Sequence, residues 1–128
     1  MKLIALVITI FFSLHSFGNI QGFLTPEQAL EIIKKEQNNS NFVIIDVRIP
    51  SEFREEHLKK AISIDFYSEI FDNEIRKLSL QNTYLVYCRT GRRSELAYNK
   101  LKALGHSNIY NLQGGIFAWK EKGYEVVR

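Results

Sequence analysis

The sequence contains one cysteine, Cys88, which opens the segment Cys88-Arg89-Thr90-Gly91-Arg92-Arg93-Ser94. The thiolate is the nucleophilic form of cysteine, and neighbouring positive charges lower the pKa of a thiol. The three arginines of this segment therefore favour a thiolate. Lowering a thiol pKa from about 8.5 to about 6.5 takes roughly 2.7 kcal/mol of differential stabilisation, a modest demand on such a loop. The segment predicts a reactive thiol in a pocket for a small anion.

The loop that carries the thiol is expected between a buried strand and a helix. The apolar run 84–87 predicts a strand that ends at Cys88, and the apolar spacing over 94–104 predicts a helix that ends at Gly105. Gly91 permits a tight or left-handed backbone that wraps the loop around the sulfur. Backbone N–H groups would then face the sulfur and form an anion site. Ser94 is either the N-cap of the helix or a ligand to the sulfur.

A thiolate in an anion pocket is suited to attack an anionic sulfur donor such as thiosulfate. Sulfite would leave, and a persulfide would remain on Cys88. A thiol, cyanide or a protein acceptor would then remove the sulfur with ping-pong kinetics. This chemistry needs no cofactor, and the sequence offers no Cys or His cluster that would hold a metal. The sequence leaves open which of the arginines Arg89, Arg92 and Arg93 faces the anion.

The pattern around this loop alternates helices and strands. Thr25-Pro26-Glu27-Gln28 forms a capping box that opens a helix. Further strands are predicted at 42–47, 61–64 and 108–112, and further helices at 67–78 and 115–122. Alternation of this kind predicts an α/β fold: a small doubly wound parallel sheet of four to five strands flanked by helices. Ligands bind at the carboxyl ends of such strands, where Cys88 falls.

The composition is that of one globular domain, with 128 residues and 45% hydrophobic content. The net charge is +3, and much of the basic character lies beside Cys88 rather than on a broad face. This distribution argues against a nucleic-acid partner and favours a small anion.

The first residues are predicted to be an export signal. Lys2 precedes the apolar run 3–14, and Ser16-Phe17-Gly18 places small residues before a cleavage point after Gly18. Residues 1–18 would then be a signal peptide, and residues 19–128 a single periplasmic or secreted domain without membrane contact. The alternatives are an uncleaved N-terminal anchor or a buried first helix. A spanning helix needs about 20 apolar residues, and this run is shorter.

Three blocks of the sequence carry a family resemblance, over roughly residues 24–127. They are Ile45-Asp46-Val47-Arg48 with Glu52-Phe53, His57-Leu58 and Ala61-Ile62; the segment Cys88 to Ser94; and Asn111-Leu112-Gln113-Gly114-Gly115-Ile116 with Trp119 and Gly123. Together they resemble the single-domain rhodanese family, whose small bacterial thiosulfate sulfurtransferases have a Cys-x-x-Gly-Arg-x-Ser loop. The resemblance implies a rhodanese-like fold and makes Arg92 the motif arginine. Where the family usually has Gly before the histidine and Pro-Gly after it, this chain has Glu56, Lys59 and Lys60.

The remaining polar residues are interpreted as framework. Asp46 and Arg48 are expected to satisfy each other and the loop backbone at a strand end, and Glu52 is a candidate partner of Arg48. His57 is expected to be structural because the reaction needs no general base once the thiolate has formed. His106 is expected to be exposed, and Trp119 to be part of the core.

Three other interpretations of Cys88 and its loop are compatible with parts of this pattern. A persulfide or sulfide carrier would use the same loop. A cysteine-dependent phosphatase needs Cys-x5-Arg, but the sixth residue after Cys88 is Ser94, and Arg93 comes one position early. In the third alternative, Cys88 is an inert core residue.

Overall fold

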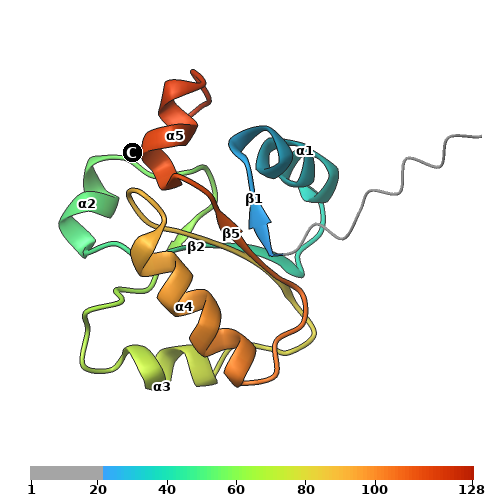
Figure 1. Ribbon diagram of the computed structural model, residues 1–128, viewed down its shortest axis with the longest axis vertical. Coiled ribbons are helices and arrows are strands. Elements are labelled where there is room, and N and C mark those ends of the chain that lie inside the picture. The colour runs from blue at the N-terminus through green and yellow to red at the C-terminus, as the bar shows by residue number, and fades with distance from the viewer. Residues whose placement is uncertain (1–21) are drawn as a thin grey trace, which may run out of the picture.

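The fold is built on a parallel sheet of five strands in the order β1-β5-β4-β2-β3. The computed structural model describes residues 22–128 (Figure 1), so the predicted signal peptide lies outside the described residues. The strands are β1 (Phe23–Leu24), β2 (Phe42–Asp46), β3 (Ile62–Ser63), β4 (Thr83–Tyr87) and β5 (Ile109–Leu112). The helices are α1 (Pro26–Glu36), α2 (Pro50–Glu55), α3 (Phe71–Arg76), α4 (Arg92–Ala103) and α5 (Gly115–Glu121).

The central strand β4 explains the two-layered core. Successive side chains of a strand point to opposite faces of the sheet. Tyr84 and Val86, followed by Cys88, pack in the core beneath α3 and α4, whereas Leu85 and Tyr87 pack in the core beneath α1 and α5. Figure 1 shows these two pairs of helices on opposite sides of the sheet. The doubly wound parallel fold predicted from the sequence is confirmed.

Several element boundaries differ from the sequence prediction. The helix predicted over 67–78 is confined to α3, because Asp65 and Ser68 accept backbone N–H bonds from residues 67 and 70 and form turns there. Helix α4 starts at Arg92 instead of at residue 94, with Gly91 as its N-cap. The short elements β1 and α2 were not predicted. The capping box of Thr25 and Gln28 is confirmed at the start of α1.

The turn before β3 has a lysine in the left-handed backbone conformation. Lys60 has a φ of 66°, in the left-handed region that favours glycine. The backbone N–H of Ala61 donates to the carbonyl of Leu58 at 3.0 Å, which closes the turn. The Lys60 ammonium donates to the carbonyl of Gln37 at 3.0 Å. The turn is therefore closed by hydrogen bonds and carries backbone strain at one residue.

Within residues 22–128, no helix combines the length and the apolar character that a bilayer-spanning segment requires.

Candidate active site

The loop after β4 folds around the sulfur of Cys88. The backbone N–H of Gly91 donates to Sγ at 3.1 Å, and the Ser94 hydroxyl donates to Sγ at 3.3 Å. Cys88 is only 1% exposed, and Ser94 is fully buried. The thiol thus lies at the base of a compact pocket made by its own loop and the first turn of α4.

Hydrogen bonds lower the pKa of this thiol. Burial alone raises the pKa of Cys88, because it penalises the charged thiolate. Hydrogen bonds from the Ser94 hydroxyl and from the backbone of Ser94, Gly91 and Thr90 outweigh burial, so the pKa lies below its ordinary value. The direction and the role of the backbone donors agree with the sequence prediction, whereas the Ser94 hydroxyl, and not the arginines, is the main side-chain cause.

The sequence left open whether Ser94 caps the helix or binds the sulfur, and in the structure the N-cap is Gly91. Gly91 is the N-cap of α4 and has a φ of 109°, which an L side chain rarely adopts. Ser94 lies within the first turn of the helix instead of capping it, and its hydroxyl lies within hydrogen-bonding distance of both Sγ and the Gly91 carbonyl, the latter at 3.1 Å. Ser94 is therefore a ligand to the sulfur.

The three arginines of the loop have different environments. Arg89 and Arg92 are exposed, whereas Arg93 is half-buried. Arg93 forms a two-pronged ion pair with Glu52, at 2.8 and 3.2 Å, and lies 5.9 Å from the centre of the Tyr67 ring. The hydrogen bond to Glu52 raises the pKa of Arg93, and the charge of Cys88 raises it further. Glu52 thus holds Arg93 beside the thiol loop, whereas Arg89 and Arg92 are exposed and form no ion pair within residues 22–128.

Asp46 and Arg48 form the buried framework that the sequence predicted. Arg48 Nε lies 3.0 Å from both carboxylate oxygens of Asp46, and Nη2 lies 2.7 Å from Oδ2. Nη2 also donates to the carbonyl of Glu56 at 2.6 Å. The predicted pairing of Arg48 with Glu52 is wrong, because Glu52 instead pairs with Arg93, 41 residues away. This pair joins α2 to the start of α4.

The first turn of α5 fixes the backbone of the loop. The N–H of Ile116 donates to the carbonyl of Cys88 at 2.9 Å, and the N–H of Phe117 donates to that of Arg89 at 3.0 Å. Gly115 lies so close that a Cβ there would overlap both carbonyl oxygens. The sequence places this glycine in a block that resembles the family but does not indicate its contact with the loop. Two adjacent glycines before a helix were the available signal.

The other histidine and tryptophan predictions have mixed outcomes. His57 Nδ1 lies 2.8 Å from the Phe53 carbonyl, and the two rings stack at 3.8 Å, which agrees with a structural role. Trp119 is buried beneath α5 as predicted. The prediction for His106 is wrong: it is only 3% exposed, because its ring packs edge-on against Tyr84.

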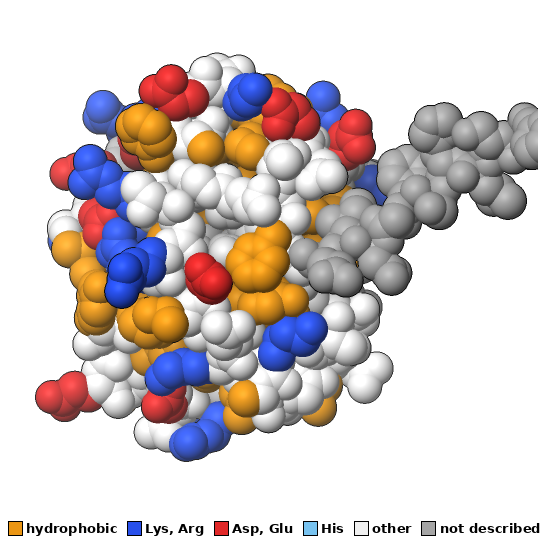
Figure 2. Space-filling view, in the orientation of Figure 1, with side chains coloured by type: hydrophobic (Ala, Val, Ile, Leu, Met, Phe, Trp, Pro, Cys, Tyr) orange, Lys and Arg blue, Asp and Glu red, His pale blue; other side chains and the backbone are white. Residues whose placement is uncertain are grey.

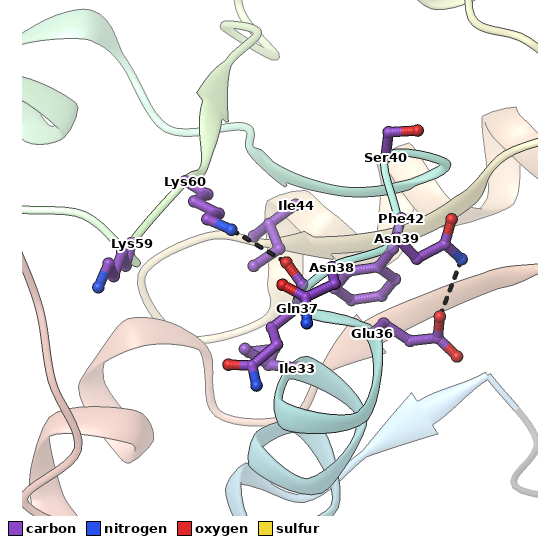
Figure 3. A pocket seen from close by; sticks show the side chains of 10 residues that line it. All are labelled: Ile33, Glu36, Gln37, Asn38, Asn39, Ser40, Phe42, Ile44, Lys59 and Lys60. Atoms are coloured by element: carbon purple, nitrogen blue, oxygen red, sulfur yellow. Dashed lines mark hydrogen bonds between the residues drawn. The ribbon is translucent and has the colours of Figure 1, made fainter.

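Two of the cavities lie at different ends of the sheet. One of about 300 Å³ adjoins the thiol loop and lies between α2 and α5. The other, of about 520 Å³, is shown in Figure 3. Its walls come from the end of α1, the start of β2 and the Lys59-Lys60 turn, so it lies at the amino end of β2, away from Cys88.

Comparison with known proteins agrees with this geometry. The family model for the rhodanese-like domain matches residues 25–122. The chain belongs to the rhodanese-like family. This membership confirms the resemblance predicted from the three sequence blocks.

The rhodanese-like relatives include enzymes and uncharacterized proteins. The chain is 35% identical to the thiosulfate sulfurtransferase GlpE of Pseudomonas putida over 97 residues, which cover 76% of this chain and 83% of GlpE. It is 34% identical to an uncharacterized protein of Synechocystis over 67% of this chain, but spans only 47% of that protein's length. The crystal structure of a rhodanese-related protein from Thermoplasma volcanium has a TM-score of 0.70 and 31% identity, and covers 81% of this chain and 95% of its own.

Proposed function

We propose that this rhodanese-like protein is a sulfurtransferase that moves sulfane sulfur from thiosulfate to an acceptor through a persulfide on Cys88. The observation that carries the proposal is the pair of donors on the sulfur, the Gly91 N–H at 3.1 Å and the Ser94 hydroxyl at 3.3 Å. Membership of the sulfurtransferase family supports it, as does the similarity to a named thiosulfate sulfurtransferase.

In the first step, the Cys88 thiolate attacks the outer sulfur of thiosulfate. The bond between the two sulfurs of the donor breaks, sulfite leaves with the electron pair, and a Cys88 persulfide anion remains. In the second step, cyanide attacks the outer persulfide sulfur, thiocyanate forms, and the Cys88 thiolate is regenerated. Neither step requires a proton from the protein. The donors that hold the thiolate also suit the persulfide, because its negative charge lies in the same loop.

The chemistry of the surroundings also supports a negatively charged donor. Arg89 and Arg92 are exposed on the loop and form no ion pair with any residue in 22–128. Figure 2 shows Lys and Arg side chains gathered near the start of α4, with hydrophobic side chains beside them. An approaching dianion would therefore meet uncompensated positive charge before it reaches the buried sulfur.

The test is to incubate the protein with thiosulfate and measure its intact mass. We expect the mass to increase by one sulfur atom, and the Cys88→Ser variant to show no increase. Addition of cyanide should then remove the sulfur as thiocyanate, with parallel-line double-reciprocal plots. Absence of the adduct with thiosulfate alone, in a protein that forms thiocyanate when cyanide is added, would refute the persulfide route. A single sulfur load without turnover would instead favour a carrier, and hydrolysis of an aryl phosphate without sulfur transfer would favour a phosphatase.

A further inference from the structure

The cavity beside the thiol loop has walls that carry charges of both signs. The residues that line it come from α2, from α5 and from the segments that follow β2 and β4. They are Arg48, Glu52, Glu55, Glu56, Arg89, Ile116, Phe117, Lys120 and Glu121. Figure 1 shows α2 and α5 at the same end of the sheet, and Figure 2 shows charged side chains of both signs around hydrophobic ones on this part of the surface.

Ion pairs within the cavity wall leave some charges free. Glu52 is paired with Arg93, and Glu56 with Lys120. In contrast, Glu55 and Glu121 form no ion pair or side-chain hydrogen bond with any residue that the structure describes, and the same holds for Arg89. The free charges are therefore two carboxylates and one guanidinium.

A buried donor also faces this space. Arg48 is 4% exposed, and its Nε and Nη2 are bound to Asp46 and to the Glu56 carbonyl. Its Nη1 forms no hydrogen bond within residues 22–128, and Arg48 lines the cavity. Nη1 therefore keeps some solvent contact at the cavity, and a carboxylate is a suitable acceptor for it.

The cavity also borders the loop that carries the reacting atom, through Arg89. Ile116 and Phe117 line it, and their N–H groups are those bound to the carbonyls of Cys88 and Arg89. The outer sulfur of a persulfide lies about 2 Å beyond Sγ, which extends the reactive atom away from the buried thiol. Phe117 is 57% exposed, so the cavity offers an apolar surface for a short carbon chain.

From these observations we propose that the cavity binds the sulfur acceptor, and that this acceptor is a small thiol bearing both a carboxylate and an ammonium group. The carboxylate would bind Arg48 Nη1 and Arg89, and the ammonium would bind Glu55 and Glu121. This inference rests on the proposed sulfurtransferase function. A volume of about 300 Å³ is at the small end of ligand cavities, which favours a molecule of metabolite size over a protein segment.

The transfer step is balanced without a further reagent. The acceptor loses its thiol proton to solvent, and its thiolate attacks the outer sulfur of the Cys88 persulfide. The bond between that sulfur and Sγ breaks, and Sγ leaves as the thiolate with the electron pair. The product is the persulfide of the small thiol, and no external oxidant or reductant takes part.

The experiment separates sulfur loading from sulfur discharge. The protein is loaded with thiosulfate, freed of donor, and discharged with four probes: cysteine, 3-mercaptopropionate, cysteamine and 2-mercaptoethanol. Rates are compared at equal thiolate concentration. We expect cysteine to give the highest rate at low concentration and 2-mercaptoethanol the lowest. Equal rates for all four probes would overturn the inference.

A double variant tests the ammonium site. In Glu55→Gln/Glu121→Gln, the apparent KM for cysteine should rise about 3- to 10-fold, as expected for the loss of two exposed charge contacts. Discharge by 2-mercaptoethanol and by cyanide should not change. The control Glu31→Gln/Glu74→Gln removes the same charge from α1 and α3, away from the cavity, and should leave all four probes unaffected.

The outcomes also distinguish this inference from the proposed function. Failure of the unaltered protein to accept sulfur from thiosulfate would refute the proposed function itself. Normal loading and normal cyanide discharge, with an unchanged KM for cysteine in the double variant, would refute only the acceptor site.

Discussion

Replacing Ser94 with alanine should raise the pKa of the Cys88 thiol. The Ser94 hydroxyl is the only side-chain group within residues 22–128 that donates a hydrogen bond to Sγ, at 3.3 Å. A hydrogen bond to a charged group contributes about 1.5–3 kcal/mol, and one pKa unit corresponds to about 1.36 kcal/mol. We therefore expect Ser94→Ala to remove about 1.5–3 kcal/mol of thiolate stabilisation and so to raise the pKa of Cys88.

The direction of this effect follows from the loss of a donor to the thiolate, and the remaining donors limit its size. Burial already raises the pKa of Cys88, and the hydrogen bonds of the loop reverse that effect. Without the Ser94 hydroxyl, the backbone N–H groups remain as donors, so the shift should be partial. The fraction of thiolate at neutral pH would fall, and the rate of sulfur loading at that pH would fall with it.

The assay is a pH titration of the thiolate by ultraviolet absorbance. Because Cys88 is the only cysteine of the chain, the signal has one source. The midpoint of iodoacetamide alkylation against pH provides a second readout that does not depend on the absolute rate. Thr90→Ala is the control, because the exposed Thr90 side chain forms no hydrogen bond within the described residues. A folded Ser94→Ala protein with an unaltered midpoint would show that the hydroxyl does not stabilise the thiolate.

Three other changes have predicted outcomes. Lys60→Gly should raise the free energy of unfolding by about 1 kcal/mol, measured by urea denaturation, because glycine adopts a φ of 66° without the strain of a side chain. Gly115→Ala should abolish sulfur loading of Cys88 in the mass assay and lower stability by about 2 kcal/mol or more, because its Cβ would overlap loop carbonyls. Burial lowers the pKa of His106 below its value in the unfolded chain, about 6.5. The contribution of the neutral His106 ring to the free energy of unfolding should therefore be complete above about pH 6.5 and decline as the pH falls toward the folded pKa. Urea titrations at several pH values should show a weaker pH dependence in His106→Leu.

For each of these three variants, one result would contradict the prediction. A destabilised Lys60→Gly protein would mean that the Lys60 bond to the Gln37 carbonyl outweighs the backbone strain. Full sulfur loading by Gly115→Ala would show that the loop tolerates displacement of α5. An identical decline in stability at low pH for wild type and His106→Leu would assign that decline to other groups.

The sequence was informative where the deciding interactions are local. The apolar run before Cys88 predicted β4, the capping box of Thr25 and Gln28 predicted the start of α1, and Gly91 predicted the left-handed turn of the loop. Each of these signals depends on residues within a few positions of each other.

Interactions between segments that are distant in the sequence could not be predicted from local patterns. The pairing of Glu52 with Arg93 depends on how α2 lies against α4, which no local pattern encodes. The burial of His106 depends on a contact with Tyr84, 22 positions earlier in the chain. Strand β1 has only two residues, too few to show any periodicity, and it pairs with β5 at the other end of the chain.

The attachment of α5 to the thiol loop has a consequence for the order in which the site is completed. The carbonyls of Cys88 and Arg89 are held by residues 116 and 117, which leave the ribosome almost thirty residues after the cysteine. During synthesis, the nascent chain therefore exposes its single thiol before the helix that fixes the surrounding backbone exists. A product terminated before residue 116 would carry the nucleophile without this support, so the reactive geometry requires the chain through residue 117.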